Sequence, residues 1–193
     1  MTLTAILPSL RRTLPDPIDA TCWPVHTEPT PTDVRVSAVS MARLADVAGT
    51  PCVHTAEEAP PRFRPRDWTP RGMSVTVAAV TGVAWVDGAL LVGLDAVVPD
   101  CAVLGQVRLI GRCSTAAPAP ATFTATPVPT MPVPTMPVPT MSVPSAQDPA
   151  DRGTAARVTT LPADVAVGDL VCFPCRRALT HRDVAAVVTG VSR

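Results

Sequence analysis

The stretch MSVTVAAVTGVAWVDGALLVGLDAVV, residues 73–98, carries the strongest fold signal in this sequence. Valine and other apolar residues alternate with small or polar ones on both sides of Asp87-Gly88. Asp-Gly between two apolar runs is the strongest short-range indication of a β-hairpin with a primed two-residue turn. Asp87, Asp95 and several glycines interrupt the apolar run, so it suits strands better than a membrane helix. We expect two paired strands here, within a β-rich domain.

On the N-terminal side of this hairpin, the pattern predicts a strand, a short helix and another strand. Residues 33–39, DVRVSAV, alternate like a half-buried strand. Ser40 is a suitable N-cap for a two-turn helix over residues 41–48, and Gly49 suits the position just after its end. Residues 51–54, PCVH, are expected to form a further short strand.

On the C-terminal side, residues 103–111 are predicted to be a strand with the odd-numbered side chains on one face. Gly168-Asp169 indicates a turn before a strand at residues 170–173, and residues 183–191 are expected to close the sheet. The total is seven or eight strands and one short helix. This predicts a mainly β fold, a single β-barrel or sandwich domain.

Composition divides the chain into three parts. Residues 1–31 are proline-rich and predict an extended lead-in, while residues 32–115 and 151–193 form a discontinuous β-domain. Residues 116–150 are rich in Pro and Thr, and repeat Thr-Met-Pro-Val-Pro with a period of five. Frequent proline denies a sheet its donors and favours polyproline II, so this low-complexity insert is predicted to be a disordered spacer or a ligand for a proline-recognising domain. The arginine-rich, proline-rich residues 56–72 are predicted to be a loop.

Charge and cysteine content narrow the classes of function. The formal net charge is zero and all 16 basic residues are arginine, so lysine is absent. Without a concentrated basic face, nucleic-acid binding is not expected, and no signal peptide or membrane segment is predicted. A cytoplasmic location is therefore expected, where the six cysteines stay reduced.

Cys172 and Cys175, with His181 six positions on, have the inner spacing of half a zinc site. A structural zinc site usually needs a second such pair, which the sequence lacks, and a redox motif would require an α/β context. The alternative is that the two cysteines are half-buried on a strand end. Cys52 and His54 are similarly expected to serve packing, and Trp23, Trp68 and Trp85 to be core or lid residues.

Three stretches then stand out in order along the chain. The first is DPIDATCWPV (residues 16–25) followed by VRVSAVSMARLADVAGTPCVHTAEE (34–58), the second is VRLIGRCST (107–115), and the third is LPADVAVGDLVCFPCRRALTH (161–181). Together they resemble the fold-type III decarboxylases that depend on pyridoxal phosphate (PLP), which include diaminopimelate and ornithine decarboxylases. The resemblance covers the family's N-terminal lead-in and C-terminal β-domain. It implies a single β-domain like the C-terminal domain of those enzymes.

The resemblance also implies a missing part. In the family a (β/α)₈ barrel lies between these two regions and carries the Schiff-base lysine and the phosphate-binding glycines. In this chain the arginine-rich residues 56–72 take its place. The family's lead-in packs on its C-terminal β-domain, so the remaining parts are expected to form one core. A chain without lysine cannot hold PLP as an internal aldimine, so no cofactor is expected on this chain alone.

By resemblance, Cys113 stands where the family has the active-site cysteine that acts as a general acid on the partner subunit's cofactor. The acid expected shortly after it is absent, and Leu179 replaces the tyrosine that contacts the cofactor. We therefore expect a chain that is catalytically inactive alone, and that forms a homodimer or associates with a full-length decarboxylase-like protein. The alternatives are a non-enzymatic interaction module that uses the proline-rich repeat, and a zinc site at Cys172, Cys175 and His181.

Overall fold

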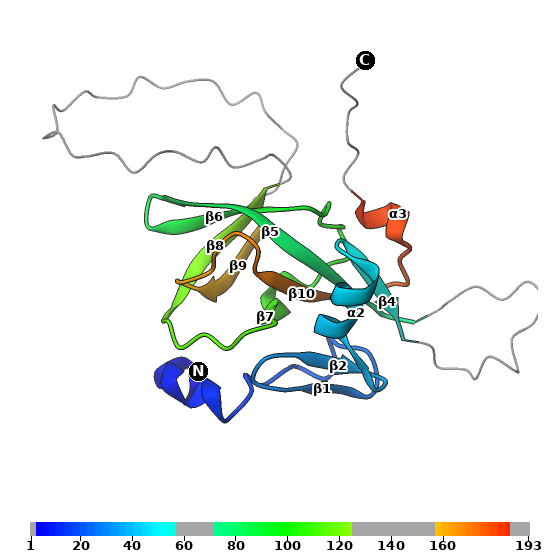
Figure 1. The fold of residues 1–193 in the computed structure, drawn as a ribbon, viewed down its shortest axis with the longest axis horizontal. Coiled ribbons are helices and arrows are strands. Elements are labelled where there is room, and N and C mark those ends of the chain that lie inside the picture. Colours follow the sequence, from blue (N-terminus) through cyan, green and yellow to red (C-terminus); the bar gives the residue numbers. More distant parts are fainter. Residues whose placement is uncertain (1–2, 57–71, 125–156, 186–193) are drawn as a thin grey trace, which may run out of the picture.

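A computed structural model describes residues 3–56, 72–124 and 157–185, and its architecture is mainly β, which confirms the predicted fold class (Figure 1). A small antiparallel sheet has the order β1-β2-β3, with bounds Thr27–Pro29, Val34–Val36 and Val39–Ser40. A seven-stranded sheet has the order β7-β10-β5-β6-β8-β9, with β4 also paired to β5. Its strands are β4 (Cys52–Thr55), β5 (Ser74–Val86), β6 (Ala89–Leu94), β7 (Arg108–Ile110), β8 (Pro118–Thr124), β9 (Arg157–Pro162) and β10 (Leu170–Cys175). The helices are α1 (Leu3–Ile6), α2 (Met41–Ala48) and α3 (His181–Val184), with 3-10 turns η1 (Pro8–Arg12) and η3 (Leu104–Gln106).

The β5–β6 hairpin forms as predicted and is the spine of the large sheet. Asp87 and Gly88 both have positive φ, at 50° and 79°, as a primed turn requires. The first half of β5 pairs with β10 on one side and β4 on the other, and its second half pairs with β6. A register shift between Val80 and Gly82 separates the two halves. β5 therefore pairs with three other strands, β4, β6 and β10.

The large sheet curls on itself. At its far end, β9 comes back toward η3 and β7, and the Thr159 hydroxyl donates a hydrogen bond of 2.6 Å to the Leu104 carbonyl. Inside the curl lies a cluster that we call the sheet core, whose large members include Leu90, Val92, Phe123, Leu161, Val171, Phe173, Leu179 and Val184. The sheet therefore forms a half-barrel around its own apolar side chains.

A second cluster joins the N-terminal part to the other face of the large sheet, and we call it the seam core. It contains Trp23, Val34, Val36, Met41, Ala45, Cys52, Ala56, Val75, Val77, Ile110 and Cys172. The Gly111 amide also donates to the Thr32 carbonyl at 2.7 Å. Although β2 pairs only within the small sheet, its side chains therefore share one core with the large sheet.

The helix prediction was correct at both ends. The Ser40 side chain accepts a hydrogen bond of 3.0 Å from the Arg43 amide, which caps α2. Gly49 follows the helix with φ at 76°, the left-handed region that favours glycine. The Asp33 carboxylate adds a second anchor, because it accepts from the Ala42 amide and from the Ser40 hydroxyl.

Two predicted strands were wrong in part. Residues 33–39 reverse direction at Ser37 and Ala38, which have φ at 49° and 67°, so β2 and β3 form a hairpin instead of one strand. Within residues 103–111, Leu104–Gln106 forms η3, and only Arg108–Ile110 forms a strand. In both places a local turn forms where the alternation of apolar residues had predicted a continuous strand.

The C-terminal strand predicted over residues 183–191 begins as a helical turn. The Asp183 carboxylate accepts from both the amide and the hydroxyl of Thr180, at 2.7 and 2.8 Å, which starts α3. Ala185 then makes a single bridge to Ala96. The rest of that predicted strand lies outside the described residues.

The predicted domain limits also need two corrections. The lead-in, residues 1–31, is not simply extended, because it contains α1, η1 and β1. The insert does not begin at residue 116, because Pro118–Thr124 forms β8 between β6 and β9. Its alternating Ala119, Ala121 and Phe123 are buried, and pairing with β6 starts only at Ala121, beyond both prolines.

Some predictions cannot be compared with the structure. The repeat at residues 126–144, the loop at residues 57–71 and Trp68 lie outside the described residues. In the described part of the chain, no helix has the length and apolar character needed to cross a membrane.

Candidate functional site

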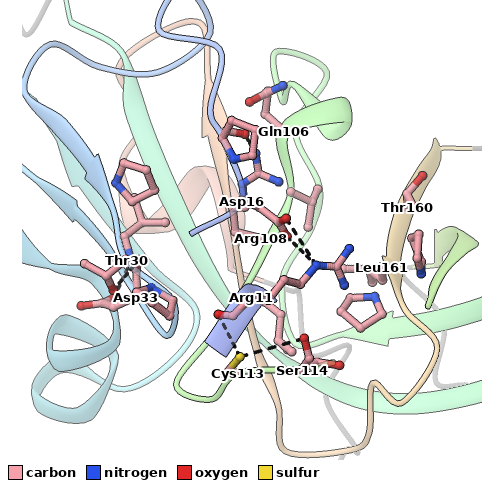
Figure 2. A pocket seen from close by; sticks show the side chains of 18 of the residues that line it. Arg11, Asp16, Thr30, Asp33, Gln106, Arg108, Cys113, Ser114, Thr160 and Leu161 are labelled. Atoms are coloured by element: carbon pink, nitrogen blue, oxygen red, sulfur yellow. Dashed lines mark hydrogen bonds and ion pairs between the residues drawn. The ribbon is translucent and has the colours of Figure 1, made fainter. Parts of the chain in front are cut away.

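A cavity of about 370 Å³ opens where the N-terminal segment meets the edge of the large sheet (Figure 2). We call it the seam cavity. Its lining comes from five places in the chain: η1 and the residues after it, the turn between β1 and β2, the η3–β7 segment with Cys113 and Ser114, Pro118 of β8, and β9. Polar groups are concentrated in it, namely Arg11, Asp16, Thr30, Asp33, Gln106, Arg108, Arg112, Cys113, Ser114 and Thr160.

Cys113, the candidate from family resemblance, lies in this cavity. Its thiol donates to the Arg11 carbonyl at 3.2 Å, as Figure 2 shows. The Arg11 guanidinium in turn donates to the Ala116 carbonyl at 3.1 Å and forms an ion pair with Asp16 at 3.2 Å. The N-terminal segment is therefore bound directly over Cys113. Among the described residues, no carboxylate or imidazole is hydrogen-bonded to this thiol.

Arg108 is the most unusual polar group of the cavity. It lies on β7 opposite Cys172 of β10, on the face that the seam core covers. One terminal nitrogen donates to the Pro17 carbonyl, but the Nε atom is buried and has no partner among the described residues. Burial lowers the pKa of Arg108, while the Asp16 carboxylate opposes that shift. A buried guanidinium nitrogen without an acceptor is costly and calls for an explanation.

Unlike Arg108, Arg112 has carboxylate partners for its guanidinium nitrogens. It makes a two-bond contact with the Asp169 carboxylate, at 2.7 and 2.6 Å, and a further ion pair of 3.2 Å with Asp164. Hydrogen bonding to Asp169 raises the pKa of Arg112. Burial of Asp169 works against ionisation, but the hydrogen bonds from Arg112 and the Ala166 amide outweigh it, so the pKa of Asp169 is lowered. Arg112 thus pairs with two carboxylates and links the turn before β10 to the chain just after β7.

The structure does not bring Cys172, Cys175 and His181 together. The two cysteines are three apart on a strand, where side chains alternate, so they point to opposite faces. Cys172 belongs to the seam core and Cys175 to the sheet core, and burial raises the pKa of both thiols, that of Cys175 to about 12. His181 lies elsewhere, with Nδ1 at 3.0 Å from the Pro51 carbonyl. No group of three metal-ligating side chains exists within the described ranges, so the zinc alternative fails on geometry.

Leu179 is turned into the protein interior. Its side chain is 5% exposed within the sheet core, and its carbonyl accepts from the Thr55 hydroxyl at 3.3 Å. It does not line the seam cavity, so the structure does not unite it with Cys113. A buried leucine offers no polar contact at the position where the family has its cofactor-contacting tyrosine. Together with the absence of lysine from the sequence, this means that the residues present do not fit PLP.

The sequence-based search missed Arg108 and Gln106. The available signal was the alternation of residues 108–110, in which the charged Arg108 shares a strand face with the buried Ile110. Gln106 carried no signal, because its role depends on a distant contact: its Oε1 accepts from Trp23 Nε1 at 3.1 Å and from the Asp19 amide at 3.0 Å. Trp23 is buried as predicted, whereas Trp85 is 56% exposed.

Comparison with protein-family models and with curated protein sequences finds no match to this chain.

Proposed function

We propose that this chain is a barrel-less relative of the fold-type III PLP-dependent decarboxylases, inactive alone, whose β-domain acts by association. The partner would be a second copy or a full-length homologue, in the cytoplasm. One observation carries the proposal: Ala56 and Gly72, the described residues on either side of residues 57–71, meet at one point of the β-domain, and this is where the family has its barrel.

That point is the junction between β4 and β5. The two strands are antiparallel neighbours with Thr55 opposite Ser74, and the Ala56 amide donates to the Met73 carbonyl at 3.1 Å. A methyl group on Gly72 would lie only 2.0 Å from the Ala56 carbonyl oxygen, so the two chain segments approach as closely as a glycine allows. A whole domain can be present or absent at such a junction without disturbing the sheet, because the two ends already meet.

The seam core supports the same proposal. In the family, the lead-in packs on the C-terminal β-domain, and here Trp23, Val36 and Met41 are buried against Val75 and Val77. The parts before and after the junction therefore have a shared core that does not depend on a barrel. This is what a domain that lost its barrel needs in order to fold.

The absence of catalysis is tested with PLP itself. The N-terminal amine is the only primary amine of the unmodified chain, because lysine is absent. We expect the folded protein to give no saturable aldimine absorbance band and to release no carbon dioxide from diaminopimelate or ornithine. N-terminally acetylated protein is the matched control for adventitious reaction at the amine. A saturable band that requires the folded state, or any decarboxylation by the protein alone, contradicts the proposal.

Association is tested separately by sedimentation of the protein alone and mixed with a full-length fold-type III decarboxylase. A dimer or a mixed complex that survives dilution supports the proposal, and monomers throughout contradict its second half. The alternative of an interaction module that uses the repeat stays a prediction, because residues 126–144 lie outside the described residues. Its test is a pull-down with and without those residues, and an unchanged set of partners would count against it.

A further inference from the structure

Two cysteines from distant parts of the chain lie together beside the sheet core. Cys175 is the last residue of β10, and Cys101 lies in the turn that precedes η3. In that turn the Ala102 amide donates to the Pro99 carbonyl at 3.1 Å. Cys101 packs against the sheet core, of which Cys175 is a buried member. Neither residue lines the seam cavity.

The backbone holds these two cysteines in register. Ala102 forms an antiparallel bridge with Cys175. The Cys101 carbonyl accepts from the Arg176 amide at 3.0 Å, and a second bond between the same two segments, of 2.9 Å, lies on the other side of the bridge. This pattern makes Ala102 and Cys175 a non-hydrogen-bonded pair, with Cα atoms about 4.5 Å apart.

That register gives a separation suitable for a disulfide. Cys101 is one residue, or about 3.4 Å, farther along its segment than Ala102. Its Cα atom is therefore roughly 5 to 6 Å from that of Cys175. Disulfides usually join residues whose Cα atoms are about 4.4 to 6.8 Å apart. The backbone does not have to move far, if at all, for the two sulfurs to bond.

The side chains also approach each other. Burial is the main cause of the raised pKa of Cys175, and a hydrogen bond with the Cys101 side chain raises it further. The Thr76 hydroxyl lies 3.7 Å from the Cys175 sulfur and opposes this shift. Cys172, although only three residues from Cys175, belongs to the seam core on the other face of β10. The thiol that Cys175 meets is therefore that of Cys101.

The two thiols differ in their access to solvent. Cys175 is 0% exposed, whereas Cys101 is half-buried. An oxidant that arrives from solvent therefore meets Cys101 first. Cys175 keeps its proton at neutral pH, because its pKa is about 12, and a protonated thiol is a poor target for an oxidant. An accessible cysteine beside a sheltered one is the arrangement of an attacking and a resolving thiol.

We propose that Cys101 and Cys175 are a thiol pair that hydrogen peroxide converts to a reversible disulfide. Peroxide first oxidises Cys101: the S–O bond of a sulfenic acid forms, the O–O bond breaks, and one water leaves. The Cys175 sulfur then attacks the Cys101 sulfur, so that the S–S bond forms and the S–O bond breaks. The departing hydroxide takes the Cys175 proton and leaves as a second water. The two electrons that the sulfurs lose are those that the peroxide gains.

The disulfide would join the turn before η3 to the end of β10, and a dithiol would release it. In a reducing compartment such a bond forms only in response to an oxidant. The pair does not depend on the ancestry proposed above, since it needs neither PLP nor a partner.

The test is treatment of the folded protein with hydrogen peroxide, then alkylation of the remaining thiols and digestion after arginine. Cys101 is the only cysteine of peptide 72–108, while Cys172 and Cys175 share peptide 158–176. We expect the intact chain to lose the mass of two hydrogen atoms and two of its six thiols, and these two peptides to be linked until a dithiol is added. Oxidation of Cys101 without a link, or a link from Cys101 to any other peptide, overturns the proposal.

Cys172 gives a matched control, because it is also 0% exposed on β10 but faces the other core. Cys172→Ala should keep the linked peptides. Cys175→Ala should lose them and leave Cys101 as a sulfenic acid that dimedone traps, and in Cys101→Ser the Cys175 thiol should stay reduced. A link that survives in Cys175→Ala, or oxidation of Cys175 in Cys101→Ser as fast as in the unaltered protein, contradicts the proposal.

Should Cys175→Ala not fold, the unaltered protein decides the matter. Fragmentation of its linked peptides assigns the bond to Cys172 or to Cys175, and a bond to Cys172 overturns the proposal.

Discussion

Replacing Leu179 with tyrosine introduces the residue that the proposed decarboxylase resemblance would have at this position, and the structure predicts that the change is harmful. Leu179 is 5% exposed within the sheet core. A tyrosine there must fit a larger ring into a filled core, which costs about 1 to 3 kcal/mol. Its hydroxyl would be buried without a partner, at a similar cost of about 1 to 3 kcal/mol. We expect Leu179→Tyr to lower the free energy of unfolding by about 2 to 6 kcal/mol.

The assay is urea unfolding followed by circular dichroism, with Leu179→Met as the volume-conserving control. The methionine variant should lose less than about 1.5 kcal/mol. For a chain of this size, the tyrosine variant should melt about 4 to 24 °C below the unaltered protein, at roughly 2 to 4 °C per kcal/mol. The chain has no other tyrosine, so the new phenol can also be titrated by its ultraviolet absorbance without interference.

A buried phenol should resist ionisation until the protein unfolds, because burial disfavours the charged form. The opposite result would be an unchanged unfolding midpoint together with a phenol that titrates near its free value of about 10. Leu179 would then not be a core residue, and this position would be open to a cofactor.

Two further predictions concern charged and titratable groups. Arg112→Gln should lower the free energy of unfolding in urea by about 1 to 3 kcal/mol, because it leaves Asp164 and Asp169 without their cation. Arg43→Gln, at an exposed position, is the control and should change this free energy by less than about 0.5 kcal/mol. Equal effects of the two substitutions would contradict the importance of the Arg112 contacts. His54 has a buried Nε2 without a partner among the described residues, and burial lowers its pKa below the ordinary value of 6.5, so the unfolded chain takes up this proton more readily. The contribution of neutral His54 to stability is therefore complete above pH 6.5 and falls as the pH drops below that value. A His54→Gln variant should lose less stability on acidification. Parallel pH profiles of the two proteins would show that His54 is not the group responsible.

The large sheet was predictable where the sequence carries two agreeing signals. Alternation and an Asp-Gly turn both indicate the hairpin of residues 73–98, and an N-cap serine and a C-terminal glycine enclose α2. The strand reversal at Ser37 and Ala38 was not predictable in this way, because neither residue type is typical of positive φ. β8 was not predictable from composition, because Pro118 and Pro120 alternate with its buried residues and prolines disfavour a strand.

The candidate site was predictable in one respect only. The resemblance pointed to Cys113, which does lie in the seam cavity, but the groups around it come from η1, η3 and β9, and no local pattern brings these segments together. The zinc hypothesis could have been rejected from the sequence, because residues three apart on a predicted strand face opposite ways. Spacing of ligands carries meaning only together with the secondary structure on which they lie.

β10 lies between the sheet core and the seam core and contributes side chains to both. Its two cysteines can therefore report separately on the two cores. Cys172 and Cys175 are almost neighbours in sequence, yet each thiol is sealed into a different cluster. A thiol reagent can reach Cys172 only when the N-terminal layer lifts from the sheet, and Cys175 only when the half-barrel opens. The labelling rates of these two residues therefore time the opening of the two layers separately, without any engineered label.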